Sequence, residues 1–196
     1  MATATRRARA APGRADGARA ARPGGPGAAG PAADQAVTVL YHSHYAALVR
    51  EAALLVGDAA TAEDVVQDCF IAVHRAWWRV RDPGTAVFYL RRSVINKSRS
   101  VLRRRAVADR HPVLRERPLP SAEDSALAAA GVSAVRAALR ALPVRQREVL
   151  VLRYYADLSE TQIAAVMGIS RGTVKVHAAR ARNALRAALE PTALSS

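Results

Sequence analysis

Apolar residues recur at helical spacing along most of the chain, and this pattern predicts an all-α protein. In two segments the apolar positions fall three or four residues apart, as one face of an α-helix requires: Val66, Cys69, Phe70, Val73 and Trp77 in the first, and Val174, Ala178, Ala181 and Leu185 in the second. No run of alternating β-branched residues indicates a strand. Alanine, the strongest helix former, supplies much of the hydrophobic content.

In the first half of the chain the pattern predicts three helices, over residues 37–56, 61–77 and 85–105. Gly57 and Asp58 end the first helix. Thr61 is the expected N-cap of the second helix, with acidic residues in the first turn, where the helix dipole favours anions. Pro83 and Gly84 then break the chain before the third helix begins.

The C-terminal part has the features of a helix-turn-helix. Pro143 opens a predicted helix at 143–155, and Ser159 and Gln162 have the spacing of a capping box at the start of the next. Gly168 can adopt the left-handed conformation of a sharp turn, and Ser170 caps the last helix. The second helix of such a pair enters the major groove, and the residues expected to face DNA are Arg171, Thr173, Lys175, Val176, His177 and Arg180. The plainer alternative is a helical hairpin with a solvated arginine face.

Composition divides the chain into four parts. Residues 1–35 are rich in Ala, Arg, Gly and Pro without apolar periodicity, so we expect a disordered tail that is either simply solvated or touches DNA loosely. Residues 36–105 form the first helical domain. Residues 106–130 contain three prolines and form a flexible linker. Residues 131–190 form the second small helical domain, which contains the helix-turn-helix.

The formal net charge of +14 indicates a polyanionic partner, although part of the arginine excess is also what a GC-rich genome produces. Within the first domain the charges are segregated. Residues 58–68 carry four acids and no Lys or Arg, whereas residues 85–105 carry Arg and Lys and no acid. The domain thus combines an acidic, Gln-containing patch with a strongly basic face.

One stripe of the basic helix contains Arg92, Asn96, Arg99 and Arg103, and Tyr89 lies one turn before it. A basic stripe beside aromatic rings suits single-stranded or melting DNA, because arginines follow phosphates while rings stack on bases. Trp78 is a further candidate for stacking, and Trp77 is expected in the core. For Trp78 and Tyr89 the core alternative remains open. The acidic patch is either a partner surface or a helix N-terminus stabilised by its dipole.

Taken together, these residues resemble the extracytoplasmic-function (ECF) sigma factors of the sigma-70 family, in particular the actinobacterial sigma-E-like type. The stretch 62–70, in the helix that ends at Trp77, is similar to the part of the family's region 2 that docks on the polymerase β′ clamp helices. Residues 89–99 with 103–105 are similar to the part that opens and reads the minus-ten element. Residues 142–182 resemble region 4, which grips the minus-thirty-five element.

The resemblance implies a protein that binds core RNA polymerase, through the β′ clamp helices and the β flap, and directs initiation at specific promoter DNA. Glu63, Asp64, Gln67 and Asp68 are then the expected polymerase-binding residues. The arginine stripe with Trp78 and Tyr89 would contact the minus-ten element, and the last helix the minus-thirty-five element. An anti-sigma factor is a possible further partner. The short linker has no room for a region 3 domain, in agreement with the ECF group.

Two other classes of function compete with this one. A stand-alone regulator with a LuxR-like helix-turn-helix would share the run 173–177, but residues 37–105 predict no strands or phosphorylation pocket. A DNA-processing enzyme needs clustered acids, a metal set or an activated nucleophile. We expect no catalytic residue, no metal site and no cofactor. The single cysteine, Cys69, is interpreted as a core residue, and the absence of an apolar span or secretory signal favours a cytoplasmic protein without membrane contact.

Overall fold

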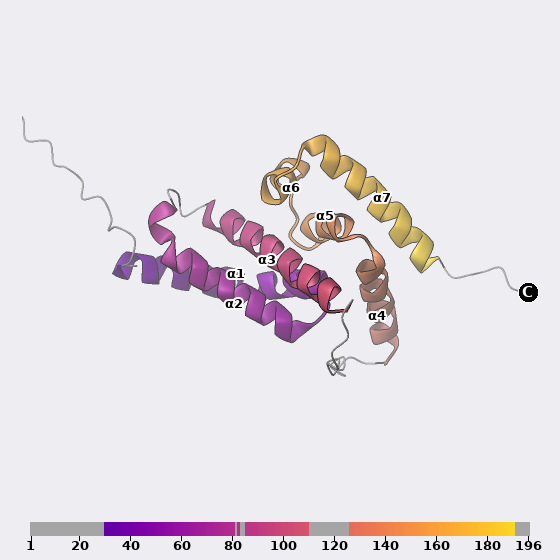
Figure 1. Ribbon diagram of the computed structural model, residues 1–196, viewed down its shortest axis with the longest axis horizontal. Coiled ribbons are helices and arrows are strands. Elements are labelled where there is room, and N and C mark those ends of the chain that lie inside the picture. Colours follow the sequence, from indigo (N-terminus) through magenta and orange to yellow (C-terminus); the bar gives the residue numbers. More distant parts are fainter. Residues whose placement is uncertain (1–29, 81, 83–84, 110–125, 191–196) are drawn as a thin grey trace, which may run out of the picture.

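The computed structural model describes residues 30–80, 82, 85–109 and 126–190. Every regular element in these ranges is helical, which confirms the all-α prediction (Figure 1). The elements are α1 (Pro31–Val56), α2 (Ala59–Arg75), the short 3-10 helix η1 (Trp77–Arg79), α3 (Ala86–Ala108), α4 (Ala126–Ala141), α5 (Val144–Tyr154), α6 (Glu160–Met167) and α7 (Arg171–Leu189). Residues 1–29 of the expected tail and 110–125 of the expected linker lie outside the described residues.

Several helix ends differ from the sequence prediction. Helix α1 begins at Pro31, because proline is tolerated in the first helical turn, so the last residues of the predicted tail are helical. Helix α3 continues to Ala108. The prediction that Thr61 caps α2 is wrong: Asp58 is the N-cap, and its carboxylate accepts a hydrogen bond of 2.8 Å from the Thr61 backbone N–H. Aspartate and threonine both favour the N-cap position, so residue type alone does not distinguish Asp58 from Thr61.

The turn chemistry predicted for the C-terminal module is confirmed. Ser159 and Gln162 form a reciprocal capping box at the start of α6, with the Ser159 N–H donating to Gln162 Oε1 at 2.8 Å. Gly168 ends α6 in the left-handed conformation, at φ 66°. The Ser170 hydroxyl then accepts a hydrogen bond from the Thr173 N–H at the start of α7. These three local signals fix the angle at which α7 leaves α6.

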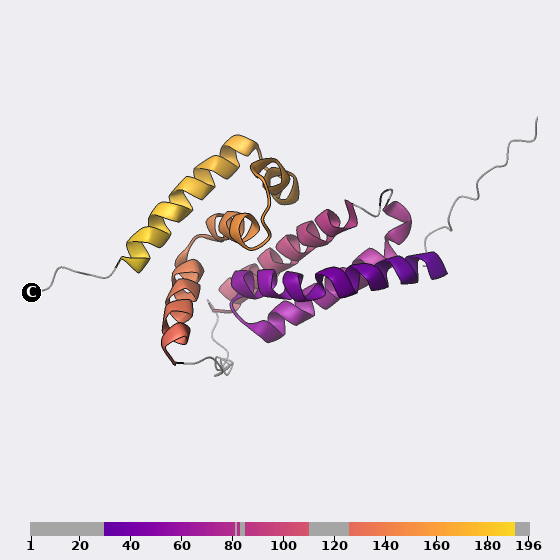
Figure 2. The ribbon, with the colours of Figure 1, turned by 180° about the vertical axis from the view of Figure 1, so that it is seen from behind.

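Helices α1, α2 and α3 pack against one another as a three-helix bundle, in which α2 runs antiparallel to the other two (Figures 1 and 2). Their shared core contains Leu48, Val66, Phe70, Leu90 and Val94, all nearly inaccessible to solvent. Cys69 is buried in the same core, as expected. Trp77 packs against it partly buried, which confirms the core interpretation of that residue.

Helices α4 to α7 form a second unit, which packs directly against α1 and α3 (Figure 2). Leu139, Leu142, Leu150 and Ala181 make one small core inside it. A larger apolar cluster is shared between the units, because Leu55 of α1 and Ile95 of α3 are buried among residues of α5, α6 and α7. The sequence predicted two domains but contained no signal for this common core.

Candidate nucleic-acid interface

The exposed face of α7 carries most of the residues predicted to meet duplex DNA. Arg171, Lys175, Val176 and Arg180 are exposed, while Val174 and Ala181 turn inward and are buried. Val176 is a bulky apolar side chain with 48% of its surface exposed. This exposure does not stabilise the free protein. The amino-terminal half of α7 therefore offers cationic and apolar groups together, the combination that reads base edges and thymine methyl groups in a major groove.

Two predicted recognition residues are less free than the sequence suggested. Thr173 is half-buried, and its hydroxyl lies 2.8 Å from the Ser170 hydroxyl, so it takes part in the helix cap. His177 is also half-buried, with Nδ1 inaccessible and without a hydrogen-bond partner among the described residues. Both residues lie at the edge of the exposed face of α7, between it and the buried side of the helix.

Among the described residues, Glu160 of α6 is the one acid that forms an ion pair with this face. Its carboxylate lies 4.0 Å from Lys175 Nζ, and the lysine is 65% exposed. An exposed pair at that distance contributes little and is screened by salt. Lys175 can therefore exchange Glu160 for a phosphate or a guanine edge at low cost.

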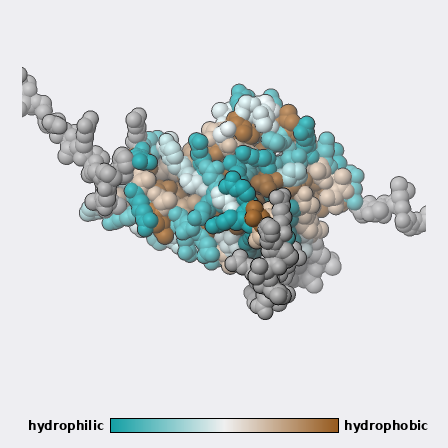
Figure 3. All heavy atoms as spheres, in the orientation of Figure 1, coloured by the Kyte–Doolittle hydropathy of each residue, from teal (hydrophilic) through white to brown (hydrophobic). Residues whose placement is uncertain are grey.

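Helix α3 presents the predicted basic stripe, but its four members are not equivalent. Arg92, Asn96 and Arg103 are exposed, and Tyr89 is 53% exposed at the start of the helix. Exposure of Tyr89 removes the core alternative for that residue. Trp78 belongs to η1, and its side chain lies outside the described part of the chain. In Figure 3 hydrophilic side chains gather over the carboxyl-terminal half of α3.

Arg99, in the middle of the stripe, is engaged within the protein. Its Nε and Nη2 donate hydrogen bonds of 2.6 and 2.7 Å to the two carboxylate oxygens of Glu148 in α5. Its Nη1 donates to Asn96 Oδ1 at 3.0 Å. The sequence pattern correctly placed Arg99 on the face of Arg92 and Asn96, but it contained no indication of this partner.

The acidic face of α2 is exposed on the side of the first unit away from the shared core. Glu63, Asp64 and Gln67 are exposed and form no salt bridge with another described residue, whereas Asp68 pairs with Lys97 of α3 at 2.8 Å. Asp68 and Lys97 line a shallow groove between α2 and α3. The sequence-predicted set is therefore contiguous along one helix face, with its last member shared with the basic helix.

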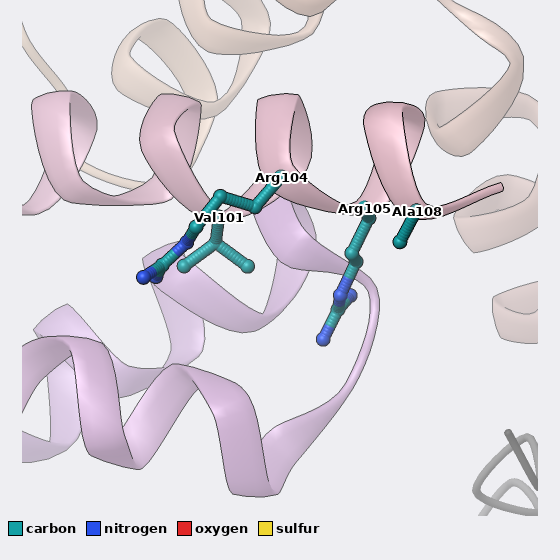
Figure 4. Close-up of a pocket in the computed structure, with 4 residues that line it drawn as sticks. All are labelled: Val101, Arg104, Arg105 and Ala108. Carbon is teal, nitrogen blue, oxygen red and sulfur yellow. The ribbon is translucent and has the colours of Figure 1, made fainter. Parts of the chain in front are cut away.

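Arg104 and Arg105 extend the positive surface to the end of α3, where they line a second shallow hollow with Val101 and Ala108 (Figure 4). Arg105 turns toward the α1–α2 connection. Its Nη1 donates to the Val56 carbonyl at 2.8 Å, and its Nη2 donates to Asp58 and Thr61. Arg105 therefore closes one end of the three-helix bundle, which leaves Arg104 as the freer cation of this pair.

Within the described ranges no three His, Cys, Asp or Glu side chains gather in a way that could hold a metal ion. Nor is any described helix long and apolar enough to cross a membrane.

Comparison with known proteins assigns both units. The family model of sigma-70 region 2 matches residues 40–107, and that of sigma-70 region 4 matches residues 133–185. The RNA polymerase sigma-E factor of Streptomyces avermitilis is 34% identical over 144 residues, which cover 74% of this chain and 79% of that protein. The ECF RNA polymerase sigma factor SigL of Mycobacterium tuberculosis is 35% identical over 159 residues, covering 77% and 87%. The chain is an ECF sigma factor of the sigma-70 family.

Two solved structures share the arrangement of this sigma factor. The sigma factor RpoE of Bartonella quintana, solved in complex with the anti-sigma factor NepR, superposes with a TM-score of 0.61 at 25% identity, covering 81% of this chain and 97% of that one. CnrH, solved with the cytosolic domain of CnrY, gives 0.59 at 28% identity, covering 79% and 92%. The alternative of a stand-alone LuxR-like regulator is not favoured by these relationships.

Sequence reasoning missed the residues that join regions 2 and 4 of this sigma factor. Arg147 and Glu148 stand next to each other in α5, and both are buried. Charged residues in an amphipathic pattern are normally assigned to the solvent face. The one available signal was that Glu148 breaks an otherwise apolar helix face, and that signal does not name a partner.

Proposed function

We propose that this sigma factor binds core RNA polymerase through the exposed face of α2 and holds a promoter at two places. Helix α7 would enter the major groove of the minus-thirty-five element, and the stripe on α3 would contact the minus-ten element as it melts. The observation that carries this proposal is that one chain presents two separate basic helix faces, α3 and α7, beside one acidic face on α2. The chemistry of RNA synthesis would belong to the polymerase.

Residue chemistry supports this division of roles. Arg171, Lys175 and Arg180 are exposed donors for guanine edges or phosphates, and Val176 can contact a thymine methyl group. Tyr89 is an exposed ring beside Arg92, suited to stacking on an unpaired base. Glu63, Asp64 and Gln67 offer acceptors to a basic partner helix, for which the β′ clamp helices are our candidate, and region 4 would meet the β flap. We infer that the protein acts in the cytoplasm, with an anti-sigma factor as a possible regulator.

Run-off transcription with purified core polymerase tests this proposal. The template is a library of duplexes randomised over both promoter elements, and the transcripts are sequenced. The sigma factor should direct initiation from a distinct subset of duplexes, and core polymerase alone should not. Specific duplex binding without core, combined with failure to support initiation, would instead favour a stand-alone regulator.

Two sets of variants separate the roles. Lys175→Ala should weaken promoter use and leave core binding unchanged. The double variant Asp64→Ala, Gln67→Ala should weaken core binding and leave binding of region 4 to a selected duplex unchanged. Equal losses in both assays for both sets would contradict the assignment of α2 to polymerase and α7 to DNA.

A further inference from the structure

The contact between Arg99 and Glu148 joins region 2 to region 4 through a buried carboxylate. The Glu148 side chain is 1% exposed, and the Arg99 side chain is 20% exposed. Both carboxylate oxygens are used, at 2.6 and 2.7 Å, in the two-pronged geometry that arginine forms with carboxylate and phosphate groups. Arg145 adds only a longer contact of 3.7 Å to the same carboxylate.

A buried arginine beside Glu148 makes a second connection between the two units. Arg147 Nη1 donates to the Leu55 carbonyl of α1 at 2.6 Å, and its Nη2 donates to the carbonyls of Arg140 and Leu142. The Leu55 carbonyl lies in the last turn of α1, where helix carbonyls have no partner in their own helix. Arg147 therefore satisfies backbone groups of both units at once.

Apolar packing between these charges makes the interface resemble a core. Leu55 is 2% and Ile95 2% exposed, in one cluster with Leu152, Ile163 and Met167 of region 4. Separating the units would return these side chains to water, which is unfavourable because buried apolar surface becomes exposed. The two units are thus held together by specific contacts rather than by proximity along the chain.

This closed arrangement does not fit the two promoter grips. Helix α3 packs directly on α6, and packed helices are about 8–10 Å apart. The minus-ten and minus-thirty-five positions differ by about 25 base pairs. At about 3.4 Å per base pair, this spacing is roughly 85 Å of duplex. A chain that holds both elements must therefore separate region 2 from region 4. The number of residues between α3 and α4, positions 109–125, sets an upper limit of about 55 Å on the distance between the two helix ends.

We propose that Glu148 holds the free sigma factor closed by occupying Arg99, so that the DNA-reading stripe of α3 becomes complete only when region 4 leaves it. The carboxylate takes the place on the guanidinium that an anionic DNA group would take. Opening frees Arg99 and simultaneously lets α7 move away from α3. The inference rests on the proposed function in one respect, because it takes Arg99 to be a DNA-contacting residue.

Two variants of the full chain open this interface in different ways. Glu148→Gln removes the charge and keeps the shape, and its control is Glu190→Gln, which makes the same charge change at an exposed site at the end of α7. Ile95→Ala loosens the apolar contact and leaves every charge in place. Its control is Val94→Ala, which opens a cavity in the separate core of region 2.

Small-angle X-ray scattering measures the opening, and fluorescence anisotropy with a short fluorescein-labelled single-stranded oligonucleotide measures access to α3. Both test variants should increase the radius of gyration and bind the oligonucleotide about tenfold more tightly, because affinity scales with the open fraction. Both controls should match the wild type. Adding Arg99→Gln to Ile95→Ala should remove most of the gain.

Circular dichroism shows whether each variant is folded. If Glu148→Gln does not fold, the measurements on Ile95→Ala decide the test. Unchanged compactness and affinity in the folded test variants would overturn the proposal, as would expansion without any gain in binding. Expansion with tighter oligonucleotide binding in a chain that fails to support initiation would leave the closed contact standing and reject only the proposed function. Normal initiation together with an unchanged radius of gyration would leave the proposed function standing and reject the closed contact.

Discussion

Arg91 of α3 and Glu51 of α1 form a buried ion pair inside region 2. Arg91 Nη2 lies 3.1 Å from Glu51 Oε1, and Arg91 Nε reaches both carboxylate oxygens at 3.2 and 3.3 Å. Their side chains are 14% and 6% exposed. The pair joins residues 40 positions apart and ties α3 to α1.

Removing one partner of this pair should destabilise region 2 strongly. Glu51→Ala leaves the Arg91 guanidinium buried without its counter-charge, which typically costs about 3–5 kcal/mol. Denaturant unfolding followed by circular dichroism measures the loss. The matched control is Asp68→Ala, whose pair with Lys97 is 55% and 41% exposed and should cost less than about 1 kcal/mol. Equal losses would show that burial does not distinguish the two pairs.

The glycines that flank the turn into α7 should respond oppositely to alanine. Gly168 has φ +66° with open space where a Cβ would lie, so Gly168→Ala should cost about 1–2 kcal/mol from backbone conformation alone. Gly172 lies within α7, where an added Cβ would meet only Ser170 Oγ at 3.8 Å. Gly172→Ala should therefore stabilise by about 0.5–1 kcal/mol. Thermal unfolding of the two variants measures both signs, and a shift in the same direction would contradict this account.

Stability should fall at alkaline pH because of Cys69. Burial raises the pKa of this thiol to about 11, and Asp68 adds to the effect while Lys97 opposes it. The folded state therefore keeps the thiol proton at pH values where the unfolded chain has lost it. The stability that this proton provides is fully present below the pKa of the unfolded chain. It is lost as the pH rises from about 9 to 11, by no more than about 3 kcal/mol.

Unfolding free energies of the wild type and Cys69→Ala across that pH range check this expectation. The alanine variant cannot ionise at this position, so the difference between the two proteins should narrow as the pH rises. A constant difference would show that the thiol titrates normally. Alkylation by iodoacetamide should also be slow in the folded protein, because the protonated, buried thiol is a poor nucleophile.

Lys175 should contribute to promoter affinity in a way that its salt dependence reveals. If Lys175 neutralises one phosphate, Lys175→Ala should lower the slope of log affinity against log salt by about 1 and weaken all duplexes similarly. If it reads a guanine edge, the loss of about 1–3 kcal/mol should be confined to duplexes with that base. Titrations of selected and unselected duplexes at several salt concentrations distinguish the two. If neither the salt slope nor the affinity changes, Lys175 does not contact the promoter.

The sequence by itself determined the features that depend on neighbouring residues. The capping box at Ser159, the left-handed Gly168 and the cap at Ser170 are local, because a turn or cap is decided by a few residues and their backbone. The face of α7 that carries Lys175 also followed from helical period alone. The resemblance to ECF sigma factors drew on the same short motifs, and the comparisons confirmed the family.

Only the tertiary structure decided which charged residues are free. Arg99 and Arg103 look alike in sequence, yet Arg99 is held by Glu148, 49 residues away, while Arg103 remains exposed. Period fixes the face on which a side chain lies but not the surface that packs on that face. The burial of Leu55 and Ile95 beneath region 4 likewise depends on long-range packing that no local pattern encodes. The helix-turn-helix is thus determined by neighbouring residues, whereas the closed pairing of regions 2 and 4 arises from contacts between residues that are distant in the sequence.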